Sequence, residues 1–414
     1  MQVLKAYPDV GRESLCSQME KLIVGPLKAT GTQTLIIIDA LDECKDEKPS
    51  SAILSILSCY VDQIPNVKFF ITGRPEPQIR SGFRLESLAP ITEVLKLHEV
   101  KPKAIDRDIE LFFRTQLASI AKHRSDFDLT EDWPSSSQIE VLCKKAAGFF
   151  IYASTAVKFI GSNIDPPTER LSLIISLPES TIEEGRSGVD QLYIEVLEQA
   201  FFVHKDNSQG YLRFQAVVGA ILLVFNPLSI KGLSELLGYN TQHLRSTIRS
   251  LHSLLLIPES TEDPIHIFHK SFPDFLMDPD RCQDKRFFVE SAVHHAEILL
   301  ACLRLMEKKL KKNIYNLDDY AILSEIKNLS TCKKAHIGDS LEYACKFWTK
   351  HLLGIPSNSP YAQEVQKAVD KFFRVHLLHW IEVLVLTRNL GVGVYAMNDI
   401  EQWYHLVSDV QVVH

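Results

Sequence analysis

Two short apolar segments, each followed at once by charged residues, constrain the fold of this chain most strongly. Leu35 to Ile38 is wholly apolar and is followed by Asp39, and the apolar-rich segment from Val67 to Thr72 is followed by Gly-Arg-Pro at 73–75. Between them, Ala52 to Val61 has its apolar residues at helical spacing. A strand, a helix and a second strand with short connections predict a parallel βαβ unit. We expect its first strand to be buried on both faces, as strands of parallel sheets usually are.

The carboxyl ends of these two strands form the predicted site. Asp42 and Glu43 follow Asp39 within one turn, and Arg74 follows the second strand. Open α/β folds bind ligands at the carboxyl edge of the sheet, so Arg74 should reach the same crevice as Asp39 if the strands are adjacent. Carboxylates grouped there need a cation or hydrogen-bond donors, and Mg²⁺ suits them because it also takes water and phosphate oxygens. The alternative is a solvated acidic turn with a surface arginine.

Composition excludes several classes of protein. The chain has 414 residues and a net charge of -7, with no basic excess to attract nucleic acid. Its longest apolar run, Ala216 to Phe225, has ten residues and is too short to span a membrane. The eight cysteines lack metal-ligand spacing, which favours a reducing compartment. We therefore expect a soluble cytoplasmic protein that binds neither nucleic acid nor membrane.

The remainder of the chain predicts helices. Further helices are expected at 14–27, 105–120, 136–160 with a break near 148, 189–202, 212–225, 230–237 and 241–251, and residues 163–186 read as a connector. Segments 254–257 and 265–268 predict a β-hairpin after a helix triad, the arrangement of a winged helix. The predicted fold is mainly α with an N-terminal α/β portion. Its domains are an α/β portion at 1–95, a small helical domain with linker at 96–187, a winged helix at 188–280 and a helical arm at 281–414.

Two motifs carry a family resemblance. IIIDALDEC at 36–44 resembles the Walker B segment of NACHT-type NTPases, and FFITGRPEPQIR at 69–80 resembles their sensor 1 segment. Both motifs occur in the STAND class of signalling ATPases, to which the NACHT-type NTPases belong. The sequence resembles the fungal, nephrocystin-like group of that class. Segments in the expected order extend it: 17–27, 146–160, 227–238, 249–260, 265–282, 302–317 and 342–352. The resemblance implies a P-loop NTPase sheet, then a helical domain, a winged helix and a helical arm.

The resemblance also implies roles for individual residues. Asp39 would hold Mg²⁺ through water, and Asp42 and Glu43 would supply the catalytic or water-positioning carboxylate. Arg74 would sense the terminal phosphate, and His269 would contact the diphosphate of the bound nucleotide. The implied cofactors are ATP and ADP with Mg²⁺.

One element of the family pattern is absent from the sequence. A phosphate-binding loop needs Gly-x-x-x-x-Gly-Lys followed by Ser or Thr, and none of the 17 glycines precedes a lysine. We therefore expect a fragment of a nucleotide-dependent molecular switch. Its NACHT fold would be incomplete, because the chain is truncated after the P-loop. As this chain it would bind or hydrolyse ATP poorly, or hold no nucleotide at all.

Two other functions stay open. The chain could be a non-enzymatic interaction or regulatory module that pairs with intact NACHT relatives or with a second copy of itself. Less favoured is a winged-helix DNA binder that uses residues 241–253, with Arg245 and Arg249, because few basic side chains flank that helix.

Overall fold

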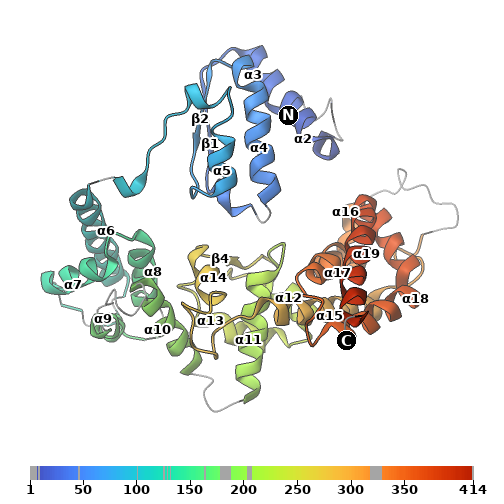
Figure 1. Ribbon diagram of the computed structural model, residues 1–414. Coiled ribbons are helices and arrows are strands. Elements are labelled where there is room, and N and C mark those ends of the chain that lie inside the picture. The colour runs from blue at the N-terminus through green and yellow to red at the C-terminus, as the bar shows by residue number, and fades with distance from the viewer. Residues whose placement is uncertain are drawn as a thin grey trace. The chain divides into compact units, whose positions relative to one another are not determined.

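The chain folds as two compact units, residues 1–100 and 101–414 (Figure 1). The computed structural model describes residues 7, 10–44, 47–99, 101–124, 126–127, 129–130, 132–162, 165–177, 188–202, 208–317 and 329–412. Helices dominate, and the strands of the N-terminal unit form a small parallel sheet. The predicted mainly α fold with an N-terminal α/β portion is confirmed at this level. The finer division at residues 187 and 280 stays a prediction.

The first unit contains the predicted βαβ arrangement. Strand β1 (Thr34–Ile38) pairs in parallel with β2 (Val67–Ile71), and α4 (Glu47–Tyr60) connects them. The predicted helix at 14–27 is a continuous helical segment made of α2 (Leu15–Met19), the π-helix η2 (Glu20–Val24) and α3 (Gly25–Thr30), and α5 (Pro77–Gly82) follows β2. Parallel strands need a crossover of this kind, since a tight turn can join only antiparallel strands.

Within the described part of the first unit only one face of this sheet is covered, so the expectation that the first strand is buried on both faces is wrong. Ile36, Ile38, Phe69 and Ile71 pack against the unit's core, to which the flanking helices contribute Met19, Val24, Leu54, Leu57 and Ile79. The opposite face carries the exposed Leu35, Ile37, Lys68 and Phe70, which the register places opposite one another in pairs. A local run of apolar residues predicts a strand but cannot reveal how many layers cover it.

The second unit begins with a helical group. It comprises α6 (Pro102–His123), α7 (Ser136–Ala146), α8 (Phe150–Ile160) and α9 (Pro167–Ser176). The predicted break near 148 is confirmed, because Ala147 and Gly148 both have positive φ. The predicted connector at 163–186 is wrong where α9 lies, while 163–164 and 178–187 are outside the described residues. Prolines at 166 and 167 suggest a loop, but proline is also common in the first turn of a helix. Leu171 and Ile174 of α9 are fully buried, so this helix is stabilised by packing.

The middle of the second unit carries the predicted helices and hairpin. Helices α10 (Gly188–Phe202), α11 (Ser208–Leu223), α12 (Ile230–Leu237) and α13 (Thr241–Arg249) precede strands β3 (Leu255–Leu256) and β4 (His266–Ile267), and α14 (Ser271–Leu276) follows. The two strands are antiparallel. The identity of this region as a winged helix stays a prediction. Among the described residues, no helix is both long enough and apolar enough to cross a bilayer.

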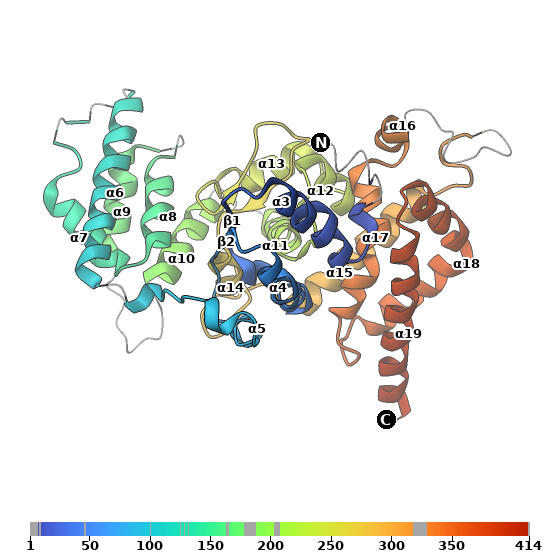
Figure 2. The ribbon, with the colours of Figure 1, turned by 90° about the horizontal axis from the view of Figure 1, so that it is seen from above.

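The C-terminal part of this unit is a helical array. It comprises α15 (Ser291–Lys309), α16 (Leu329–His336), α17 (Gly338–Leu353), α18 (Ala362–Leu386) and α19 (Leu390–Val412). Figure 2 shows α17, α18 and α19 beside one another, and each of them buries one tryptophan. The indole N–H groups of Trp380 and Trp403 donate to the carbonyl oxygens of Cys345 and Ile355 at 2.8 and 2.9 Å, which satisfies these buried polar atoms.

A chain of buried and part-buried hydrogen bonds joins this array to the segment that follows α11. The Phe225 N–H donates to the Tyr343 hydroxyl at 3.2 Å, which lies 2.7 Å from Nε2 of His351, and His351 Nδ1 lies 2.9 Å from Nδ1 of His295. The donors match their acceptors when Tyr343 donates to His351 and His351 donates to His295. The opposite order leaves the Tyr343 proton without an acceptor among the described residues. Both imidazoles are therefore neutral.

Acidification should weaken the fold through His295. Burial, and then the neighbouring His294, lower the pKa of His295 from 6.5 to about 4. Between pH 6.5 and about 4, His295 is protonated in the unfolded chain but not in the folded chain. The free energy of unfolding therefore falls as the pH falls. This site contributes at most about 1.4 kcal/mol per pH unit. We expect His295→Gln to show a shallower loss of stability from pH 6.5 to 4.5 in urea unfolding followed by tryptophan fluorescence.

A matched control separates this site from general acid effects. His405 lies on α19 with its side chain 76% exposed, so His405→Gln should keep the wild-type slope. Equal slopes for His295→Gln and wild type would contradict the assignment of a neutral buried pair.

Candidate functional site

The two strands end at the same level, which brings the segments that follow them together. Ile38 is the register partner of Ile71 at the last position of the pair. Beyond it the ladder continues, because the Thr72 N–H donates to the Ile38 carbonyl and the Leu41 N–H donates to the Thr72 carbonyl, both at 2.9 Å. The expected convergence of the Asp39 and Arg74 segments at one sheet edge is therefore present in the fold.

Asp39 is exposed and is oriented by the hydroxyl of Thr72. This hydroxyl donates to Asp39 Oδ1 and accepts the Ala40 N–H at 2.8 Å. Ala40 has a left-handed backbone with φ 51° and ψ 51°, which turns the chain sharply after the strand. Left-handed alanine is uncommon and costs about 1 kcal/mol or more, so the bonds on both sides of Ala40 must hold it.

Thr72 was missed by reasoning that looked only for charged groups. A signal was available, since a hydroxyl residue directly follows the second strand and stands two positions before Arg74.

Asp42 occupies a different environment from Asp39. It is only 8% exposed, and its Oδ1 accepts the Arg74 backbone N–H at 3.1 Å while Oδ2 lies 3.6 Å from the Arg74 Nε. The Arg74 side chain is 44% exposed. Asp42 therefore fastens the segment after β2 to the short helix η3 (Leu41–Glu43), and Glu43 of the same turn is exposed. The catalytic roles suggested for Asp42 and Glu43 stay predictions.

The Asp39 carboxylate suits a hard cation that retains water. Mg²⁺ is commonly bound through one or two carboxylates together with water and phosphate oxygens, and an exposed carboxylate beside a hydroxyl provides oxygen donors of that kind. Within the described ranges, no group of three or more His, Cys, Asp and Glu side chains could hold a metal ion. A cation at Asp39 would therefore need ligands from water and from a phosphate.

His269 lies in the second unit, two residues after the end of β4. It is exposed, and its Nδ1 lies 2.7 Å from the Ser271 hydroxyl and accepts the Ser271 N–H at 3.1 Å. The predicted site residues are thus distributed over both units: Asp39, Asp42, Glu43 and Arg74 belong to the first, and His269 to the second.

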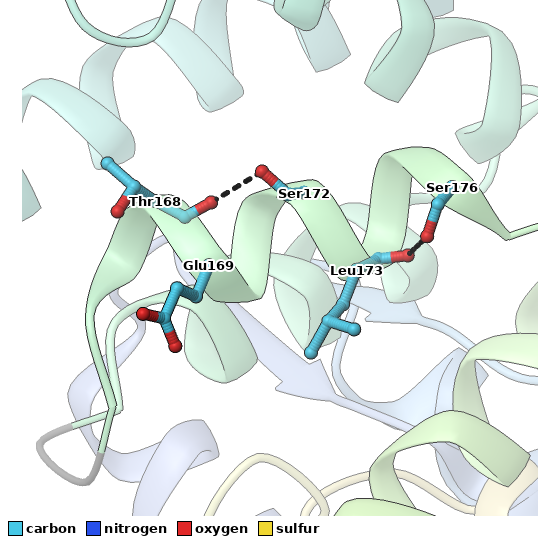
Figure 3. Close-up of a pocket in the computed structure, with 5 residues that line it drawn as sticks. All are labelled: Thr168, Glu169, Ser172, Leu173 and Ser176. Atoms are coloured by element: carbon cyan, nitrogen blue, oxygen red, sulfur yellow. Dashed lines mark hydrogen bonds between the residues drawn. The ribbon is translucent and has the colours of Figure 1, made fainter.

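An open hollow over α9 is a weaker candidate. Figure 3 shows its lining, which comes from α9 alone: Thr168, Glu169, Ser172, Leu173 and Ser176. The hydroxyls of Ser172 and Ser176 donate to the carbonyls of Thr168 and Leu173, each at 2.8 Å. Because these serines are engaged by their own helix, the hollow offers little beyond one carboxylate for ligand recognition.

Comparison with known proteins bears on the first unit most directly. Residues 2–74 match the family described as "Nephrocystin 3, N-terminal", a range that contains both strands, Asp39 and Arg74. Over 390 residues the chain is 23% identical to "Vegetative incompatibility protein HET-E-1" of Podospora anserina, which covers 89% of this chain. Both matches support a NACHT-like family. The chain spans 26% of the length of that relative.

Removing the Asp42 carboxylate should loosen the strand ends. Asp42→Ala takes away the acceptor of the Arg74 N–H and the partner of its guanidinium, and hydrogen bonds to charged groups contribute about 1.5–3 kcal/mol. We expect amide hydrogen exchange in 38–44 and 67–74 to accelerate by about tenfold or more, because each 1.4 kcal/mol changes an equilibrium tenfold.

Two exposed aspartates provide the controls for that measurement. Asp62→Ala, in the short 3-10 helix η4 (Val61–Gln63), should leave exchange unchanged. Asp39→Ala should have a smaller effect because, among the described residues, the Thr72 hydroxyl is the one hydrogen-bond partner of its carboxylate. Wild-type protection in Asp42→Ala would show that Asp42 does not hold the two segments together.

Proposed function

We propose that this chain is part of a STAND-class NTPase that acts as a nucleotide-dependent molecular switch. The observation that carries the proposal is the convergence of the Asp39 and Arg74 segments at the carboxyl ends of two adjacent parallel strands. That edge is where open α/β folds bind ligands, and it combines a carboxylate for a hydrated cation with a guanidinium for a phosphate. The NACHT-like matches support the same assignment.

Each site residue has a distinct role in this proposal. Asp39, oriented by Thr72, binds Mg²⁺ through water, and Arg74 contacts the terminal phosphate. A phosphate competes with Asp42 for the Arg74 guanidinium, which is already half-exposed and lies 3.6 Å from the carboxylate. Glu43, which is exposed beside them, and Asp42 are the candidates to position or deprotonate an attacking water. His269 contacts the diphosphate from the second unit.

The switch itself is a population shift. In this proposal, ADP with Mg²⁺ favours a closed state of the switch, and exchange for ATP favours an open state that assembles into oligomers. A ligand can shift such an equilibrium only by its difference in affinity for the two states. The region proposed as a winged helix, with His269, and the helical arm that follows it would move as nucleotide contacts change.

This chain should be a poor ATPase by itself. Without a Gly-Lys-Ser or Gly-Lys-Thr sequence it offers a nucleotide few of the backbone N–H groups and no lysine of the kind that normally surround phosphates. The proposal therefore assigns weak nucleotide binding to this chain alone.

Nucleotide titrations test the site directly. Calorimetric binding of ADP and ATP, each with and without Mg²⁺, should show a Mg²⁺ dependence that Asp39→Asn removes. Arg74→Ala should weaken the binding of ATP by about tenfold, or about 1.4 kcal/mol, and the binding of ADP by less, because only ATP carries the terminal phosphate. Arg74→Lys keeps the charge and serves as the milder variant, and Asp62→Asn is the surface control. If Arg74→Ala bound ATP and ADP each with the wild-type affinity, the assigned role of Arg74 would be ruled out.

A non-enzymatic interaction module is the second candidate. The observation that favours it is the exposed sheet face of Leu35, Ile37 and Phe70, which are 60%, 65% and 57% exposed. Parallel sheets rarely leave such a face open, so a partner chain could cover it. The DNA-binding alternative has less support, because the Arg245 guanidinium on α13 donates to the Glu259 carbonyl.

Light scattering after size exclusion distinguishes the module from the switch. If a second copy covers the sheet face, self-association should occur without nucleotide and should decrease in Ile37→Lys. Leu378→Lys, on α18 and also strongly exposed, is the matched control and should leave association unchanged. A wild-type monomer at all concentrations would count against pairing between copies.

A further inference from the structure

Segment 91–97, near the end of the first unit, carries apolar side chains that no described residue of that unit covers. Four of its seven residues are large, apolar and more than half exposed: Ile91, Val94, Leu95 and Leu97. Residues 92–96 belong to no helix or strand, and Thr92 begins this stretch in an extended conformation with φ −98° and ψ 124°. Exposed apolar side chains that are grouped in this way indicate a surface that binds another protein surface.

The extended stretch has two different sides. Successive side chains of an extended chain point in opposite directions, so Glu93 and Leu95 share one side, and Leu97 follows at the same spacing. The other side carries Thr92, Val94 and Lys96, and Lys96 is paired with Glu99 at 2.7 Å. One side of the segment therefore combines an acidic group with apolar side chains.

The exposed face of the β1–β2 sheet has the complementary composition. It carries Leu35, Ile37 and Phe70 together with one basic residue, Lys68, which the register places opposite Leu35. Contact between two such faces would bring no acidic group to Lys68. Segment 91–97 supplies both the apolar side chains and the carboxylate that this face lacks, and charges that match across a contact favour one partner over others.

The chain is too short for the segment to cover its own sheet face. The Ser87 hydroxyl donates to the Ser58 carbonyl of α4 at 2.9 Å, and α4 packs on the opposite, covered face of the sheet. After the buried Leu88 come the 3-10 helix η5 (Ala89–Ile91) and the extended stretch, which together reach about 19 Å by Leu95. Because layers pack about 10 Å apart, the path from α4 past the sheet is about 20 Å before any detour around its edge. A second copy has no such restriction.

We propose that segment 91–97 of one copy lies across the exposed sheet face of a second copy, and that the two copies exchange these segments reciprocally. Leu95 and Leu97 contact the apolar side chains of the face, and Glu93 pairs with Lys68. Reciprocal exchange closes after two copies, so it produces a dimer instead of an open chain of molecules. The inference rests on the second candidate function, which it makes specific, and it does not depend on nucleotide binding.

Light scattering after size exclusion of the full chain, over a series of concentrations, tests the exchange. The wild type should form a dimer, and Ile37→Lys and Leu95→Lys should each weaken it tenfold or more. An equimolar mixture of these two variants should associate more tightly than either variant alone, because Leu95→Lys keeps an intact sheet face and Ile37→Lys keeps an intact segment. A mixture that associates no better than its separate components would overturn the exchange.

Charge reversal tests the predicted pairing of Glu93 with Lys68. Glu93→Lys and Lys68→Glu should each weaken the dimer several-fold, and the double variant, which restores opposite charges, should return to within about twofold of wild type. Val94→Lys is the matched control, because Val94 is equally exposed but lies on the other side of the extended stretch, and it should leave the dimer unchanged. Additive losses in the double variant, or a loss in Val94→Lys as large as in Leu95→Lys, would contradict the assigned side of the segment.

The outcomes separate this inference from the functions proposed above. Association that is lost in Ile37→Lys but retained in Leu95→Lys would support pairing through the sheet face and would overturn the role of segment 91–97. A wild-type monomer at all concentrations would overturn both, whereas the nucleotide switch stands or falls by the nucleotide titrations.

Discussion

The parallel pairing of β1 with β2 is the interaction on which the candidate site depends. Its register ends both strands at one level, and the backbone bonds of Thr72 and Leu41 extend the pairing past the last strand residues. Only because of this do a carboxylate after one strand and a guanidinium after the other occupy the same edge. The Asp42–Arg74 contact then fastens the two following segments, so the geometry of the site is inseparable from the stability of the strand ends.

Much of this arrangement could be predicted from local sequence patterns. The apolar run at 35–38 and the apolar-rich segment at 67–71, with helical spacing between them, are sufficient to predict a βαβ unit, and the charged residues after each segment locate the site. The extent of burial could not be predicted, since four consecutive apolar residues look the same whether one or two layers cover the strand. Helix α9 was missed because prolines 166 and 167 have two meanings, and only the tertiary burial of Leu171 decides between them.

The hydroxyl residues that support the site were harder to predict from the local sequence. Thr72, Ser271 and Tyr193 are common residue types with no motif of their own, and each acquires significance from a partner distant in the chain. Thr72 orients Asp39 across a strand pair, and Tyr193 supports His269 through a serine on another helix. In both cases a neutral hydroxyl fixes a titratable group, which is a general means of aiming an acid or a base without adding charge.

The Ser271 hydroxyl lies 2.7 Å from both the Tyr193 hydroxyl and Nδ1 of His269, and this has a consequence for how relatives of the chain should diverge. A phenol and a serine hydroxyl that serve a single imidazole are kept together only while that imidazole has a use. Relatives in which His269 is replaced should also lose Ser271 and Tyr193. Phe272 and Phe275 should be retained, because their rings pack against residue 193 in either case. The joint presence of the three polar side chains would then mark the branches in which the imidazole is still used.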